Sequence, residues 1–114
     1  MYKVAYLPLA IDDLKNIVRY IANELEAPRA AENLIVKIDK EVLKIADNPF
    51  RCHVYAPLEK LKYEYRVLNI DNYSLFYIVE KEKVEIHRVL YSFGNRLRED
   101  LELQEGLFLR THST

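Results

Sequence analysis

The 114-residue sequence has a single cysteine, Cys52, and only three histidines. One cysteine excludes an internal disulfide framework, and we interpret Cys52 as a free thiol without an assigned role. Because there is no second cysteine and the histidines are scattered, a zinc site is not expected either. We therefore expect one domain that folds without disulfides, metal or any other cofactor, which its length permits.

Long hydrophobic runs and a large excess of one charge are also absent. No apolar stretch approaches the roughly 20 residues that cross a bilayer, and Asp12 and Asp13 interrupt the N-terminal region before a signal-like run can form. We expect a cytoplasmic protein that makes no membrane contact. The net charge is −1, which gives no general attraction to nucleic acid and leaves any such contact local.

The region 61–98 contains three segments rich in aromatic and β-branched residues. They are Leu61–Leu68, Tyr73–Val79 and Val84–Tyr91, and the polar breaks between them read NIDN and EKEK. This pattern predicts a meander of antiparallel strands. The middle segment has apolar side chains on both faces, which favours a central position in the sheet.

Arg88 is the unusual residue of the third segment. Side chains alternate along a strand, so this arginine falls on the apolar face with Leu90, opposite Val89. A guanidinium keeps its charge at any ordinary pH. It must therefore meet a carboxylate or a bound phosphate, or be turned outward by a bulge. An internal ion pair is the simplest solution, with Glu64 or Glu85 as candidate partners.

The first half of the chain predicts one strand and two helices. Tyr2–Leu7 is short and rich in β-formers, which predicts a strand. From about Leu9, apolar residues recur at the spacing of one helical face, and Asp13 in the first turn suits the helix dipole. Pro28 fits the first turn of a second helix, and Asn48-Pro49 ends it.

The predicted order is β-α-α-β-β-β, a two-layer α+β domain in which a helical hairpin covers one face of an antiparallel sheet. The short connection between the helices makes them antiparallel. We expect the other face of the sheet to stay open, as a candidate surface for a partner protein or RNA. Residues 1–98 are assigned to this domain, and residues 99–114 to a C-terminal extension that is partly disordered.

A series of motifs, taken in order, resembles the RelE/ParE superfamily of small bacterial toxins from type II toxin–antitoxin modules, over residues 1–101. They are PLAxxDLxxIVxYI from Pro8 to Ile21, the Asn48-Pro49 end of the second helix, YRVL at 65–68, NYSLFY at 72–77, IHRVLY at 86–91 and the loop SFGNR that follows. Each motif alone is weak, but their order and spacing are specific for the superfamily. The resemblance is closer to the ParE-like, or plasmid stabilisation, members.

The resemblance implies a growth-inhibiting toxin that is neutralised by a cognate antitoxin, whose C-terminal segment wraps around the toxin's sheet and helices. ParE-like members inhibit DNA gyrase by binding to it, and this is our main hypothesis. The first alternative is a RelE-like, metal-independent endoribonuclease that cuts mRNA on the ribosome by attack of a ribose 2′-OH on the adjacent phosphate. The second alternative is a degenerate, harmless protein that still binds an antitoxin.

RNA cleavage of that kind needs a base for the 2′-OH, an acid for the leaving oxygen and cations at the phosphate. If the chain is a nuclease, the candidate residues are Arg66 and Arg88 as phosphate clamps, Arg96 as a further cation, and Tyr91 as acid, base or stacking group. His87 is a further candidate for the base, because imidazoles titrate near neutrality.

Two positions depart from the nuclease pattern. Ser74 stands where nuclease-type members typically carry an arginine, and serine cannot supply that charge. Leu90 stands where some nucleases have a catalytic histidine. The departures therefore favour gyrase binding, or a degenerate toxin, over RNA cleavage.

Overall fold

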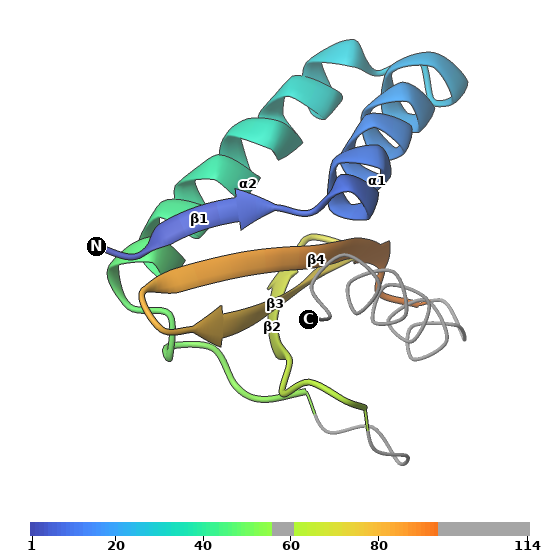
Figure 1. The fold of residues 1–114 in the computed structure, drawn as a ribbon. Coiled ribbons are helices and arrows are strands. Elements are labelled where there is room, and N and C mark those ends of the chain that lie inside the picture. The colour runs from blue at the N-terminus through green and yellow to red at the C-terminus, as the bar shows by residue number, and fades with distance from the viewer. Residues whose placement is uncertain (56–60, 94–114) are drawn as a thin grey trace.

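The computed structural model describes residues 1–55 and 61–93 (Figure 1). Residues 56–60 and 94–114, which include Arg96 and the predicted C-terminal extension, lie outside this described part. The elements are, in chain order, β1 (Lys3–Tyr6), α1 (Pro8–Arg19), η1 (Tyr20–Glu24), α2 (Pro28–Asp47), β2 (Arg66–Ile70), β3 (Tyr73–Glu80) and β4 (Lys83–Tyr91). The predicted order of one strand, two helices and three strands is confirmed.

The helical hairpin and the sheet form two layers, as predicted (Figure 1). The strand order is β1-β4-β3-β2, so β3 is central, as its two apolar faces suggested. β1 runs parallel to β4, whereas the other two pairs are antiparallel. The sheet is therefore mixed, in contrast to the wholly antiparallel sheet that we predicted. The direction of β1 depends on the path of the chain through the helices, which no local pattern encodes.

Both helices begin where the sequence signals place them. Pro8 and Pro28 occupy the start of α1 and α2, where the missing N–H has no intrahelical partner to lose. α2 ends at Asp47, just before the predicted Asn-Pro stop. The first helix closes with the π-helical η1, in which the Leu25 N–H donates to the Tyr20 carbonyl at 3.1 Å. No helix in the described ranges is long and apolar enough to cross a membrane.

The main core lies between the hairpin and the sheet. It combines aliphatic side chains of α2 with inward-facing side chains of the strands; its members include Leu34, Ile38, Val42, Ile45, Leu75, Tyr77, Val84, Ile86 and Val89. Burial of each large aliphatic side chain contributes about 1.5–3 kcal/mol. This core is what keeps the hairpin on one face of the sheet.

The other face of the sheet is not open over its centre, in contrast to our prediction. A second apolar cluster lies there; its members are Leu61, Tyr65, Val67, Phe76, Ile78 and Leu90. Tyr65 and Phe76 are completely buried. Leu61 and Tyr65 come from the segment before β2, so that segment covers the centre of this face, which is therefore no flat surface for a partner.

A bulge changes the faces of β4. Tyr77 of β3 pairs with Ile86, but its neighbour Phe76 pairs with Arg88, which leaves His87 as the extra residue. Beyond the bulge, Val89 packs into the main core and Leu90 into the second cluster. The simple alternation that placed Leu90 on the face of Val84 and Ile86 is therefore wrong after His87.

Candidate functional site

Arg88 forms a bidentate ion pair with Asp13 of α1. Its Nε donates to Oδ2 of Asp13 at 2.7 Å, and its Nη2 donates to Oδ1 at 2.8 Å. The Val89 backbone N–H donates to the same Oδ2 at 2.9 Å. An internal ion pair was predicted, but its carboxylate comes from Asp13 and not from the candidates Glu64 and Glu85.

The topology of the sheet explains why Asp13 lies there. β1 pairs only with Lys83–Ile86 of β4. Just after β1, the Leu7 N–H donates to the Ile86 carbonyl at 2.9 Å, and the pairing of the two strands ends there. Beyond that point α1 lies along the edge of β4. Asp13 lies in the second turn of α1, too far along for the dipole role we predicted, and accepts a hydrogen bond from the strand's backbone as a neighbouring strand would.

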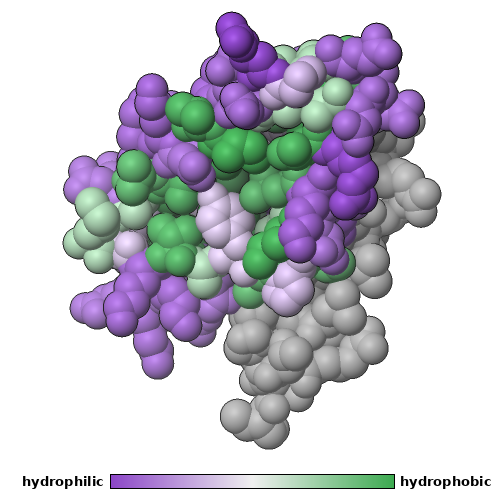
Figure 2. Space-filling model, turned by 90° about the horizontal axis from the view of Figure 1, so that it is seen from above, coloured by the Kyte–Doolittle hydropathy of each residue, from purple (hydrophilic) through white to green (hydrophobic). Residues whose placement is uncertain are grey.

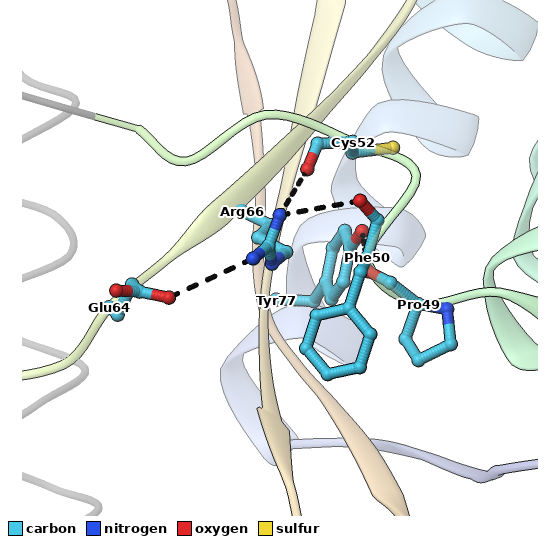
Figure 3. A network of polar contacts seen from close by, with 6 residues as sticks. All are labelled: Pro49, Phe50, Cys52, Glu64, Arg66 and Tyr77. Carbon is cyan, nitrogen blue, oxygen red and sulfur yellow. Dashed lines mark hydrogen bonds and ion pairs between the residues drawn. The ribbon is translucent and has the colours of Figure 1, made fainter.

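Arg66 lies at the start of β2 and holds the loop that follows α2 (Figure 3). Its Nη1 donates to the Cys52 carbonyl at 2.6 Å and, at 3.5 Å, more weakly to the Phe50 carbonyl. The guanidinium also lies 5.0 Å from the centre of the Phe50 ring. Glu64 Oε1 is 3.9 Å from Nη2. Most of this guanidinium is therefore engaged in structural contacts.

Tyr77 adds a second contact to the same loop. Its hydroxyl donates to the Pro49 carbonyl at 2.7 Å (Figure 3). Burial, followed by a hydrogen bond with Cys52, raises the pKa of the Tyr77 phenol above the usual value. Arg66 and Tyr77 together fasten the loop to the edge of the sheet.

The hollow beside Arg66 is of mixed charge. It measures about 450 Å³, and its described lining residues are Phe50, Tyr63, Glu64, Arg66, Ile78, Val79 and Glu80. Two carboxylates face one guanidinium that already binds backbone carbonyls. Such a lining does not favour a phosphate group, because the carboxylates repel it.

Among the described residues, the structure does not bring the candidate nuclease residues Arg66, Arg88 and Tyr91 together. Residues paired across strands share a face: Arg66 pairs with Tyr77, on the hairpin face, and Arg88 pairs with Phe76, on the opposite face. Tyr91 pairs with Tyr73, four residues along β3 from Tyr77 and thus about 13 Å away. Arg96 lies outside the described residues. The nuclease roles of these four residues remain predictions.

Ser74 is buried in a small network of uncharged groups. Its Oγ donates to Asn69 Oδ1 at 2.8 Å and lies 2.8 Å from Ser92 Oγ. Leu90, the other position that departs from the nuclease pattern, pairs with Ser74 and packs in the second apolar cluster. The two departures are therefore neighbours, and they create a neutral environment.

His87, the extra residue of the bulge, is fully buried. The Tyr65 hydroxyl lies 3.0 Å from its Nδ1, and Glu85 Oε2 lies 3.9 Å from its Nε2. His87 was a further candidate for the base, on a strand expected to have one exposed face. Its burial in this structure instead places the imidazole out of reach of a ribose hydroxyl.

Tyr91 belongs to an aromatic surface at the ends of β3 and β4. Tyr91 is 53% exposed, and the centre of its ring lies 6.0 Å from that of Tyr73 and 5.5 Å from that of Phe93, a residue that is 70% exposed. Burial, and then the neighbouring phenols of Tyr20 in η1 and Tyr91, raise the pKa of Tyr73. Sequence reasoning identified Tyr91 but not the aromatic neighbours that come from distant segments.

A groove on the helical hairpin is lined by residues of α1, η1 and α2. Its volume is about 490 Å³, and its apolar lining residues are Leu14, Val18, Ala22 and Ile35; Lys15, Arg19 and Asn23 complete it. Viewed from above, Figure 2 shows apolar side chains gathered between hydrophilic ones. The sequence did not identify Lys15 and Arg19 as candidate site residues, because two exposed cations outside an apolar stripe are ordinary for a surface helix.

Comparisons with known proteins agree with this fold. No curated protein is significantly similar in sequence. Among solved structures, the chain resembles one described as the chromosomal ParDE TA system from P. aeruginosa, with 17% sequence identity and a TM-score of 0.63. The match covers 80% of this chain and 96% of that one. The family model described as the ParE toxin of the type II toxin–antitoxin system parDE matches residues 4–92, so this chain belongs to the ParE toxin family.

Proposed function

We propose that this protein is a ParE-like toxin that arrests growth by binding DNA gyrase and is neutralised by a cognate antitoxin. The observation that carries the choice of mechanism is the separation of Arg66 and Arg88 on opposite faces of the sheet. RNA cleavage requires cations, a base and an acid around one phosphate. Inhibition by binding requires only a complementary surface.

The state of each arginine supports the same choice. Arg88 is neutralised by Asp13, and Arg66 donates to backbone carbonyls. Ser74 supplies no third cation. The exposed Tyr91 and Phe93, by contrast, are aromatic side chains of the kind in which protein interfaces concentrate their binding energy.

The groove on the hairpin supports the antitoxin partner. Its apolar lining, including Leu14, Val18 and Ile35, suits the apolar face of an amphipathic helix. An antitoxin segment in this groove would bury side chains that the free toxin leaves open to water. Neutralisation then follows from a complex that covers part of the toxin.

The test is induction of the chain in a bacterial host, with and without the product of the neighbouring reading frame. Growth, RNA 5′ ends and plasmid supercoiling are followed together, and purified chain is added to purified gyrase in a supercoiling assay. We expect arrest, altered topology, intact transcripts and rescue by the neighbouring protein. New cleavage sites inside translated codons would instead make the chain an mRNA endonuclease, and an absence of arrest would indicate a degenerate toxin.

A further inference from the structure

We propose that Lys15 and Arg19 select the antitoxin by charge, because they require carboxylates along the edge of the helix that enters the hairpin groove. The inference rests on the proposed function in one respect, namely that the natural occupant is an antitoxin. It adds to that function a chemical rule for which partners fit.

The two cations lie side by side on the groove. Lys15 and Arg19 are four residues apart on α1, so their side chains leave the same helical face on successive turns. Both residues are exposed, and both line the groove beside Leu14 and Val18. A partner that packs on the apolar lining therefore meets both positive charges.

Neither cation has a counter-charge within the described residues. Arg19 Nη1 makes a long contact of 3.4 Å with Asn16 Oδ1, a neutral group, and no ion pair of Lys15 or Arg19 is present in residues 1–55 and 61–93. Other lysines of the surface differ: Lys37 lies 2.9 Å from a carboxylate oxygen of Asp71. The groove therefore combines an apolar lining with two adjacent positive charges.

The dimensions of the groove suit a short amphipathic helix. The side of the lining that α1 and η1 supply extends from Leu14 to Asn23, nine steps of about 1.5 Å, or about 13 Å in length. That length accepts between two and three turns of a partner helix. Apolar residues at positions i, i+3 and i+7 of the partner would meet the apolar lining, and carboxylates four residues apart on its flank would meet Lys15 and Arg19.

Charge of this kind mainly determines which partner binds and how fast it associates. A helix with the same apolar face but lysines on its flank brings like charges together and is rejected. Antitoxins of other modules that lack the flanking carboxylates would bind more weakly, because they lose the attraction to Lys15 and Arg19.

The first experiment uses two synthetic helical peptides that share one apolar face and differ only on the flank, which carries glutamates in one and lysines in the other. Binding to the full chain is measured by fluorescence anisotropy. We expect the glutamate peptide to bind at least about tenfold more tightly, and we expect this ratio to fall with added salt because exposed charges are screened. Equal binding of the two peptides, or no binding of either, would overturn the inference.

A double charge reversal, Lys15→Glu with Arg19→Glu, should invert the preference for the two peptides. The matched control is Lys40→Glu with Lys62→Glu, which changes the net charge equally at exposed positions that do not line the groove. The control should keep the preference for the glutamate peptide. Circular dichroism checks that both variants fold, and an unchanged preference in a folded groove variant would contradict the proposed role.

The neighbouring protein separates this inference from the proposed function. If that protein neutralises the wild-type chain, the groove reversal should weaken neutralisation at least about tenfold, and reversal of the matching carboxylates in the partner should restore it. If the peptides behave as expected but the chain neither arrests growth nor inhibits gyrase, the proposed function fails and the charge rule stands. If arrest occurs and the groove reversal leaves neutralisation unchanged, the charge rule fails alone.

Discussion

Arg88 and Arg66 belong to the same sheet and have opposite environments. Arg88 is 9% exposed and meets the Asp13 carboxylate through two short hydrogen bonds, whereas Arg66 lies at the sheet edge and donates to backbone carbonyls. The first contact joins α1 to β4, and the second fastens a loop to β2. One residue type therefore acts in one place as a buried charge that needs a counter-charge, and in the other as a tether for a loop.

The largest effect is expected where the buried charge loses its partner. Asp13→Ala removes the carboxylate that accepts two hydrogen bonds from the buried Arg88 guanidinium and one from the Val89 N–H, so the free energy of unfolding should fall by about 3–5 kcal/mol. Urea denaturation measures it. Asp12→Ala, at an exposed neighbouring position, is the control and should stay within about 0.5 kcal/mol of the wild type. A similar small change in Asp13→Ala would mean that the ion pair is not needed for stability.

A third arginine would sharpen the comparison. Ser74→Arg places a charge at a position that is 4% exposed and hydrogen-bonded to Asn69. It should lower the free energy of unfolding by about 2–3 kcal/mol, because it buries a cation with no carboxylate beside it in the Ser74 network. Ser74→Ala, which loses only hydrogen bonds, should lose about 1 kcal/mol. Neither variant should produce RNA cleavage when 5′ ends are mapped, and cleavage by the arginine variant would revive the nuclease alternative.

Arg66→Ala should have a smaller effect than Asp13→Ala. The variant loses hydrogen bonds to two carbonyls and the contact with the Phe50 ring, but the site is partly open to water, so we expect a loss of about 1–2 kcal/mol. Arg51→Ala, an exposed arginine in the same loop, should change stability by less than about 0.5 kcal/mol. If Arg66→Ala cost as much as Asp13→Ala, the two environments would not differ as the structure indicates.

The smallest loss of stability is expected when the loop after α2 loses its hydrogen bond from Tyr77. Tyr77→Phe removes the hydrogen bond to Pro49 and should cost about 1 kcal/mol at neutral pH. The folded protein keeps the Tyr77 proton at pH values where the unfolded chain, with the ordinary value of 10.0, has released it. Wild-type stability should therefore fall as the pH rises above 10, and the deficit of the variant should shrink there. Denaturation curves at pH 8 and pH 11 test this, and a constant deficit would contradict it.

The helices and the order of the elements along the chain were predictable because their signals are local. Pro28 marks a helix start through its own backbone chemistry, and the Asn-Pro stop acts on the residue before it. The aromatic and β-branched segments likewise predicted β3 and β4 within a residue or so. β2 begins later than expected, at Arg66 rather than at Leu61, since the earlier residues pack over the second face instead of pairing with β3.

The candidate site was less predictable because its contacts join distant segments. The bulge at His87 reverses the faces of the residues after it; the position of Arg88 in the alternation allowed a bulge among three solutions but did not select it. The partner of Arg88 lies 75 residues away along the chain, on a helix whose acidic residue had an ordinary local explanation. Lys15 and Arg19 have an ordinary local pattern too, and only the packing of α2 beside α1 shows that they line a groove.

The sequence by itself determined the element order, the two apolar stripes of the hairpin and the need of Arg88 for an anionic partner or an outward turn, since periodicity, proline chemistry and the permanent charge of a guanidinium act within a few residues. The tertiary structure alone decided the parallel direction of β1, the choice of Asp13 as the partner and the separation of Arg66 from Arg88. These depend on which edges and faces meet when distant segments pack, and that is set by the sum of many long-range contacts rather than by any one residue.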